Sequence, residues 1–152
     1  MKRKLLISAC LMGIGCRYDG KSIKKVDVER ISEKYDLIPV CPEIYGGLPT
    51  PRPRSERIGN QVFFKDGTEV TENFERGAEH VIAIAKATGA RRALLKQRSP
   101  SCGKGEIFDG SFTGRVTVGL GVAAEFMMMR GIHVYTEHEI DMLLKDADAI
   151  EE

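Results

Sequence analysis

Four cysteines are the residues of this sequence whose chemistry stands out first. Three of them, Cys10, Cys41 and Cys102, lie at or just beyond the end of a short apolar run. A single cysteine in such a place is most often a small buried hydrophobic residue. Three in corresponding positions, each beside glycine, proline, serine or glutamate that packing does not require, favour a common ligand. We therefore predict that Cys10, Cys41 and Cys102 hold a metal centre.

The spacing of the cysteines indicates which kind of centre this is. Zinc fingers and thioredoxin-like redox sites use Cys-x-x-Cys pairs, and this sequence has none. Soft thiolates from distant loops suit an iron–sulfur cluster instead. With Cys16 as a fourth ligand, the cluster would be closed and suited to electron transfer. With three ligands one iron stays open to bind a substrate, and Cys16, well beyond its strand, is the least favoured of the four.

Short apolar runs alternate with helical patterns along the chain. The sequence predicts strands over residues 5–10, 37–41, 93–96 and 132–135, and helices over 26–35, 73–88, 122–130 and 137–145. This alternation is typical of a mainly parallel sheet with helices on both faces. Because the carboxyl ends of parallel strands share one edge, where open α/β sheets form their sites, the three cysteines should converge.

The expected fold class is α/β, a single three-layer Rossmann-like domain with a mainly parallel sheet and a small β-hairpin insertion. One domain over residues 1–152 is sufficient because a chain of this length buries one continuous core. The hairpin is predicted over Gln61 to Val70, where Asp66-Gly67 lies between apolar residues, and it should stand outside the main sheet. The glycine-rich run from Gly103 to Gly114 is expected to wrap the substrate pocket.

Charge and hydropathy exclude several classes of function. The 23 basic and 22 acidic residues leave a net charge of +1, so no global field draws the chain to nucleic acid or to a membrane. No run of about 18 apolar residues is present, so a membrane-spanning helix is not expected. The apolar run after Lys4 is too short for a signal peptide, so we expect a cytoplasmic protein whose thiols stay reduced.

Three longer motifs carry the cysteines, and together they resemble the TudS family of thiouracil desulfurases. The motifs are SACLMGIG followed by CRYDG (residues 8–20), VCPEIYGGLPTPRP (40–53) and SPSCGKGEIFDGSFTG (99–114). The likeness runs over nearly the whole chain, so residues 1–152 would form one TudS-like desulfidase domain. In the family pattern the place of Cys16 is frequently taken by another residue.

The resemblance implies a cofactor and a reaction. The cofactor is a 4Fe-4S cluster held by three cysteines, which match Cys10, Cys41 and Cys102 here. The reaction is the non-redox desulfuration of a thiolated uracil, of the 2-thiouracil or the 4-thiouracil and thiouridine type. Its products are uracil and sulfide, and the substrate sulfur binds the open iron. The resemblance also marks Glu43 and Ser99 as active-site groups.

The chemistry of these residues is compatible with catalytic roles. Exchange of a C=S sulfur for oxygen requires a soft Lewis acid to bind the sulfur and a water to attack the carbon. Glu43, two residues after Cys41, can take a proton from that water or orient it. Ser99 or Ser101 can donate to the heterocycle or relay a proton.

The substrate-binding residues are expected in the loops of the same motifs. Arg52 fits as a clamp for a uracil carbonyl or a phosphate, whereas Arg54 and Arg57 are interpreted as a solvated basic loop. Further substrate contacts are assigned to Gly46, Gly47 and Ser111. The expected partner is a small thiolated pyrimidine, either base or nucleotide. A thiolated tRNA is the alternative, because basic residues lie near Cys102, but no aromatic stacking surface is found beside them.

Two other functions remain open at this point, and so does the oligomeric state. The chain could be a non-catalytic metal or iron–sulfur binding module, or a thiol redox protein that uses Cys10 with Cys16. A cluster that survives the change Cys16→Ser would exclude the redox protein. Turnover of a thiouracil would exclude the passive module.

Overall fold

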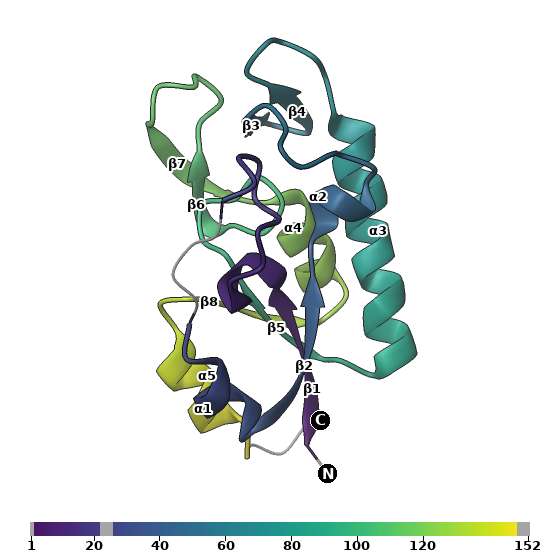
Figure 1. The fold of residues 1–152 in the computed structure, drawn as a ribbon, viewed down its shortest axis with the longest axis vertical. Coiled ribbons are helices and arrows are strands. Elements are labelled where there is room, and N and C mark those ends of the chain that lie inside the picture. Colours follow the sequence, from purple (N-terminus) through teal and green to yellow (C-terminus); the bar gives the residue numbers. More distant parts are fainter. Residues whose placement is uncertain (1, 22–25, 149–152) are drawn as a thin grey trace.

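A four-stranded parallel sheet forms the centre of the computed structural model, which describes residues 2–21 and 26–148. Its strands are β1 (Arg3–Ser8), β2 (Tyr35–Val40), β5 (Arg92–Leu95) and β8 (His133–Thr136), in the spatial order β2-β1-β5-β8 (Figure 1). β1 pairs in parallel with both β2 and β5, and β5 pairs in parallel with β8. The carboxyl ends of all four strands therefore lie at one edge of the sheet, as the alternating pattern predicts.

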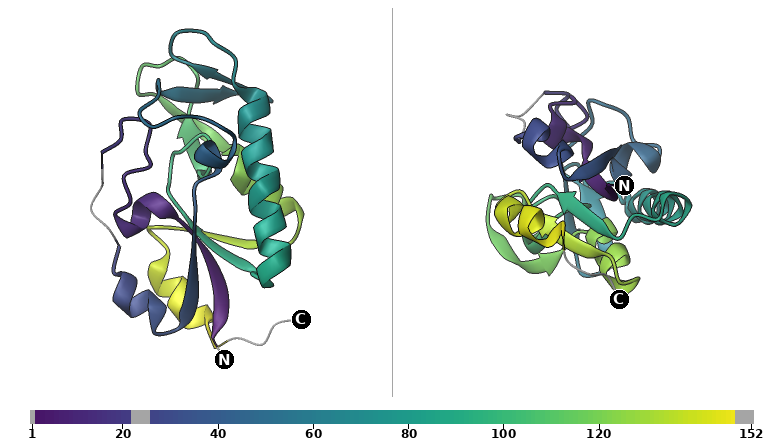
Figure 2. Two further views of the ribbon diagram at one scale, coloured as in Figure 1. Left: turned by 45° about the vertical axis from the view of Figure 1, so that its right-hand side comes forward. Right: turned by 90° about the horizontal axis from the view of Figure 1, so that it is seen from below.

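Helices cover both faces of this sheet (Figure 2). They are α1 (Val28–Ser32), α3 (Thr71–Thr88), α4 (Val122–Met129) and α5 (Ile140–Asp146). In β1, Leu6 belongs to the core that includes α3 and α4, whereas Leu5 and Ile7 belong to the core that includes α1 and α5. Successive side chains of a strand point to opposite faces, so a strand that is buried on both sides needs two helical layers. The predicted α/β class is confirmed.

Two antiparallel ribbons stand outside the main sheet, beyond its carboxyl edge (Figure 1). They are formed by β3 (Ser55–Ile58) with β4 (Gln61–Phe64), and by β6 (Lys104–Phe108) with β7 (Val116–Leu120). The hairpin predicted over residues 61–70 is present: Phe63 and Glu69 form an antiparallel bridge, and the backbone N–H groups of Phe64 and Val70 donate to the carbonyl oxygens of Thr68 and Val62. The sequence did not indicate the further pairing of β4 with β3. Gly59, with φ of 58°, adopts the left-handed conformation that the turn between β3 and β4 requires.

A short helix, α2 (Pro42–Tyr45), lies directly against α3. Two glycines permit this close contact. A Cβ on Gly77 would lie 1.8 Å from the carbonyl oxygen of Pro42, and a Cβ on Gly46 would lie 1.9 Å from that of Asn73. Any side chain at these positions would push α2 away from α3, so the glycines fix the segment that follows β2.

Among residues 2–21 and 26–148, no helix is both long enough and apolar enough to cross a membrane.

Candidate active site

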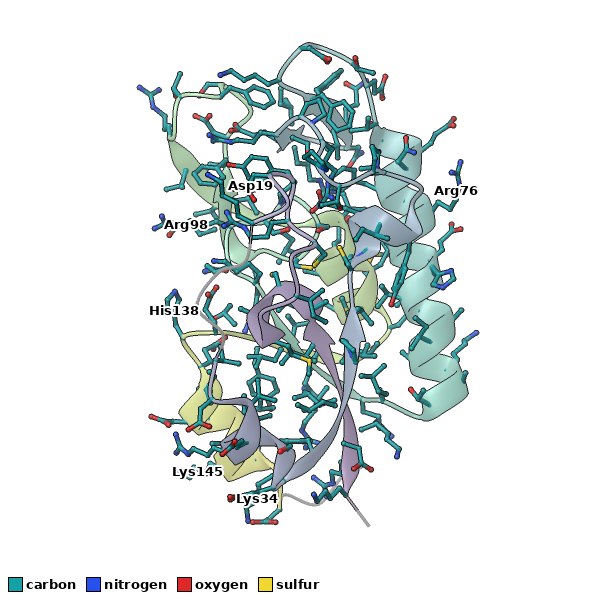
Figure 3. The ribbon with its side chains drawn as sticks, viewed as in Figure 1. Asp19, Lys34, Arg76, Arg98, His138 and Lys145 are labelled. Atoms are coloured by element: carbon teal, nitrogen blue, oxygen red, sulfur yellow. The ribbon has the colours of Figure 1, made fainter. Side chains whose placement is uncertain are left out.

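A cavity of about 340 Å³ lies at the carboxyl edge of the sheet, where β1, β2 and β5 end below the ribbons. Open α/β sheets place their binding sites at this edge. Figure 3 shows sulfur atoms, in yellow, just beyond the ends of the strands. The residues singled out from the sequence that line the cavity are Cys10, Cys16, Cys41, Cys102, Glu43, Arg52, Ser99 and Ser101.

One cysteine follows the end of each of the strands β1, β2 and β5. Cys10 lies in a 3-10 helix (Ala9–Met12) directly after β1, Cys41 lies between β2 and α2, and Cys102 lies in the turn between β5 and β6. Cys16 lies in the loop after the 3-10 helix, and all four are free thiols, of which only Cys41 is not fully buried. The structure thus brings the three predicted ligands together, with Cys16 beside them, while their role as ligands stays a prediction.

The four thiols differ in acidity. Burial raises the pKa of Cys10 to about 11 and the pKa of Cys102 to about 12, because the interior solvates a thiolate poorly. Cys41 shows the opposite shift: a hydrogen bond from the Cys16 thiol, aided by one from the backbone N–H of Ile44, lowers its pKa to about 7. The same contact with Cys41, together with burial, raises the pKa of Cys16. Cys41 is therefore the thiol nearest to its ligand form at neutral pH.

The donor set fits an iron–sulfur cluster. Thiolates are soft ligands, and iron–sulfur clusters are among the centres that they select. Within the described part of the chain, no three His, Cys, Asp or Glu side chains are grouped as a site for a single metal ion. A cluster offers each thiolate its own iron, so its cysteines stand farther apart around a wider space. Free thiols from three strand ends, placed around one cavity, suit that arrangement.

A line of hydrogen bonds connects two serines to Glu43. The Ser101 hydroxyl donates to Glu43 Oε2 over 2.9 Å, and the Ser99 hydroxyl lies 3.0 Å from that of Ser101. Because Ser101 has one hydroxyl proton and a carboxylate only accepts, Ser99 is the donor in the second bond. Ser99 Oγ in turn accepts from the backbone N–H groups of Ser101 and Cys102, over 3.1 and 3.0 Å. The three predicted catalytic residues therefore form one fixed network beside Cys102.

Arg52 holds the other oxygen of Glu43. Its Nε donates to Glu43 Oε1 over 3.1 Å, and the two side chains are only 2% and 12% exposed. Its Nη atoms donate to the carbonyl oxygens of Cys16 and Pro49 and to the Thr50 hydroxyl. Since nearly all of its N–H groups are used within the protein, these contacts favour a role as a brace for Glu43 over the predicted role as a substrate clamp.

Three residues that the sequence assigns to the substrate lie elsewhere, because none of Gly46, Gly47 and Ser111 lines the cavity. Gly46 packs against the backbone of α3, and Gly47, with φ of 89°, continues this turn. Ser111 is exposed and forms hydrogen bonds with the Asp109 and Thr113 side chains of its own loop. Gly46 therefore serves the contact between α2 and α3, Gly47 serves the left-handed turn after α2, and Ser111 serves the turn between β6 and β7.

Other residues of the cavity were not singled out from the sequence as site residues. They include Ser8, Arg17, Tyr18, Arg54, Lys96, Gln97, Arg98 and Phe108. Ser8 Oγ accepts from the backbone N–H of Lys96 over 3.0 Å and joins the ends of β1 and β5. Arg98, labelled in Figure 3, extends to the surface and pairs with Glu106. Lys96 is the last residue of a predicted strand, and Phe108 lies in the run from Gly103 to Gly114 that was expected to wrap the substrate pocket, so both positions carried a signal.

Comparisons with known proteins give matches over almost the whole chain. A family model described as 2-thiouracil desulfurase matches residues 5–139. The solved structure of a 4Fe-4S-dependent thiouracil desulfidase, TudS, is 40% identical to this chain, with a TM-score of 0.93 over 98% of this chain and 100% of that one. The uncharacterized protein YbbK of Bacillus subtilis (strain 168) is 35% identical over 150 residues, which cover 92% of this chain and 99% of YbbK. The segment matched by the family model contains the three strand-end cysteines and the whole Glu43 network.

Proposed function

The chain belongs to the 2-thiouracil desulfurase family, and from this premise we propose the reaction that it catalyses. The enzyme exchanges the sulfur of a small thiolated pyrimidine for the oxygen of water and releases sulfide. The carbon keeps its oxidation state, so the reaction needs no electron donor. The proposed cofactor is a 4Fe-4S cluster held by Cys10, Cys41 and Cys102, with Cys16 outside the ligand set. The proposed location is the cytoplasm, where thiols stay reduced.

The observation that carries this proposal is a fixed carboxylate in a thiol-lined cavity. Arg52 holds one oxygen of Glu43 and Ser101 holds the other. Ser101 Oγ is in turn 3.7 Å from Cys102 Sγ, so the carboxylate network ends beside a proposed ligand. A passive metal-binding module would have no need for this arrangement, because a general base must be held at the reacting centre only when protons are transferred.

The cluster, when bound, supplies a soft Lewis acid that attracts the substrate sulfur and polarises the carbon that bears it. The chain itself supplies the water and the proton transfer. Glu43 orients a water through the lone pairs that Arg52 and Ser101 leave free, and it accepts a proton as the water oxygen attacks the ring carbon. Arg52 keeps this carboxylate in place through the ion pair.

The two serines give the accepted proton a path. Ser101 lies between Glu43 and Cys102, so a proton taken from the water can pass from Glu43 to the thiol-lined end of the cavity. Ser101 passes on its own hydroxyl proton as it receives the proton from Glu43, and Ser99 keeps its proton and orients Ser101 through the hydrogen bond between their Oγ atoms. The line therefore connects the carboxylate that activates the water to the end of the cavity from which sulfide would leave.

Anaerobic reconstitution with a sulfide assay tests the proposal. The reconstituted protein should release sulfide from 2-thiouracil or 4-thiouracil and form uracil in equal amount. Glu43→Gln should keep the visible absorption of the cluster and lose turnover by about 100-fold or more. Cys16→Ser should keep cluster and turnover, whereas Cys41→Ser should lose both. A fully loaded enzyme that releases no sulfide from either thiouracil would refute the proposal.

The redox protein would join Cys10 with Cys16, but the thiol hydrogen bond that the structure shows at Cys16 comes from Cys41, whose Sγ lies 3.9 Å from the Cys16 carbonyl oxygen.

A further inference from the structure

Arg54 and Phe108 form a part of the cavity wall that the proton network does not use. Arg54 precedes β3, and Phe108 is the last residue of β6, so each comes from one of the two ribbons. The guanidinium carbon of Arg54 lies 4.8 Å from the centre of the Phe108 ring. At this distance the cation is attracted by the π-electrons of the ring. The two side chains therefore act as one surface that is both aromatic and cationic.

A buried carboxylate holds this surface in place. Glu56, which is 1% exposed, accepts a hydrogen bond from Arg54 Nη2 over 2.7 Å. Its other oxygen accepts from the backbone N–H groups of Gly110 and Phe112, over 2.9 and 3.1 Å. One side chain thus fixes both the arginine and the loop that follows Phe108. Fixation of this kind is what a binding group requires, since it removes the cost of ordering the group when the ligand arrives.

Arg54 retains hydrogen-bond donors for a ligand. A guanidinium has five N–H donors, and within the described residues Arg54 uses its side chain for one hydrogen bond, to Glu56. The Arg54 side chain is 34% exposed, whereas that of Arg52 is 2% exposed and bonded to four acceptors. Arg54 is therefore the better placed of the two arginines to bind a group that enters the cavity.

We propose that Arg54 and Phe108 determine which ring the enzyme accepts, an inference that rests on the proposed desulfuration. Phe108 presents an aromatic surface to the pyrimidine ring. Arg54 donates a charge-assisted hydrogen bond to the oxygen that a monothiolated uracil retains. The pair selects a planar ring that carries a carbonyl acceptor. A thiolated ring without this oxygen, such as pyridine-2-thione, still stacks but leaves the donors of Arg54 unpaired.

Arg130 offers a matched control. It also lies over an aromatic ring, with its Cζ 5.7 Å from the centre of the Phe126 ring. It is exposed, however, and it does not line the cavity. Arg130→Met therefore removes the same charge as Arg54→Met without touching the proposed surface.

Uracil binding to the reconstituted enzyme, measured by equilibrium dialysis, tests the inference without relying on turnover. Arg54→Met should weaken uracil binding by roughly 10- to 100-fold, the effect of losing a hydrogen bond from a charged donor. Phe108→Leu should weaken it by roughly fivefold or more, because a stacked ring is lost. Arg130→Met should change it by less than about twofold. In turnover, Arg54→Met should raise KM for thiouracil and reduce the preference for thiouracil over pyridine-2-thione.

This inference would be overturned if Arg54→Met and Phe108→Leu, both with full cluster absorption, kept the wild-type affinity for uracil and the wild-type preference for thiouracil over pyridine-2-thione. The proposed desulfuration would not be affected by that result. A wild-type enzyme with neither turnover of thiouracils nor uracil binding would overturn both. If Arg54→Met does not take up the cluster, Arg54→Lys replaces it, because lysine keeps the ion pair with Glu56 but offers fewer donors. An unchanged preference in that variant then overturns the inference.

Discussion

Replacement of Arg52 by methionine should both destabilise the protein and disable Glu43. The substitution removes the cation from an ion pair whose members are 2% and 12% exposed. It also leaves the carbonyl oxygens of Cys16 and Pro49 without this donor, together with the hydroxyl of Thr50. The Glu43 carboxylate would then be held by Ser101 alone and would remain buried without a counter-charge.

The expected loss in the free energy of unfolding is about 3–5 kcal/mol, the usual effect of removing one partner of a buried ion pair. Screening by solvent reduces this value little, because both side chains are almost fully buried. It is a large part of the roughly 5–15 kcal/mol that stabilises a typical domain. Arg52→Lys keeps the charge but not the forked geometry, so we expect an intermediate loss of about 1–3 kcal/mol.

Urea unfolding of the metal-free protein, followed by far-UV circular dichroism, measures these losses. Arg130→Met is the matched control, since Arg130 is exposed and should change stability by about 0.5 kcal/mol or less. The decisive variant combines Arg52→Met with Glu43→Gln. It should be more stable than Arg52→Met alone, because the second change removes the uncompensated carboxylate.

Two results would show that this reasoning is wrong. One is a loss below about 1 kcal/mol for Arg52→Met, which would mean that the ion pair contributes no more than a surface pair. The other is a double variant that is less stable than Arg52→Met. The cost would then come from the packing of the loop and not from the buried charge.

Three further predictions concern contacts that support the site and the fold. A change of glycine to alanine within a helix normally stabilises it by about 1 kcal/mol. Gly77→Ala should instead destabilise the protein and lower its cluster content, because the new Cβ would lie 1.8 Å from Pro42 O. Urea unfolding and iron content measure this, and a gain in stability would contradict it. Ser99→Ala should cost about 1–3 kcal/mol, since two backbone N–H groups lose their acceptor, and Ser99→Thr should restore most of it in the same assay; equal stability of the two variants would count against the network. Tyr35→Phe should cost about 1–3 kcal/mol at pH 7, because the phenol donates to the buried Leu143 carbonyl oxygen over 2.8 Å. Burial raises the pKa of Tyr35 from 10.0 to about 12, so its stabilising effect is complete below pH 10 and is lost as the pH rises from 10 toward 12; unfolding curves of wild type and variant should converge in that window, and a constant gap would refute this linkage.

Strand ends were the most informative feature of the sequence. Apolar runs end at Cys10 and Cys41 and shortly before Cys102. If these runs are parallel strands of one sheet, the three cysteines lie at the same edge, and the structure shows this arrangement. The cysteine motifs also indicated the hydrogen-bond network, because Glu43 and Ser101 are each within two residues of a cysteine. The structure joins the two by a single hydrogen bond, as expected for short segments at one sheet edge.

The residues that were misplaced depend on contacts between distant parts of the chain. Arg54 and Arg57 read as a solvated basic loop, yet Arg57 is buried and donates to Leu120 O, and Arg54 meets Phe108. No local sequence pattern predicts that the β3–β4 ribbon will pack against the β6–β7 ribbon. Gly46 likewise looked like a substrate loop, because only the course of α3 shows that its missing side chain makes room for another helix.

The strand order also fixes when the site can form during synthesis. β1 lies between β2 and β5, so one of its neighbours is made soon after it and the other only when Arg92 emerges. Until then one edge of β1 stays unpaired, and its apolar residues Leu5 to Ile7 are open to association with other chains. An incomplete chain that ends before β5 would carry three of the four cysteines but neither Ser101 nor Cys102. Insertion of the proposed cluster would therefore be a late event, because an earlier nascent chain lacks one of the three proposed ligands.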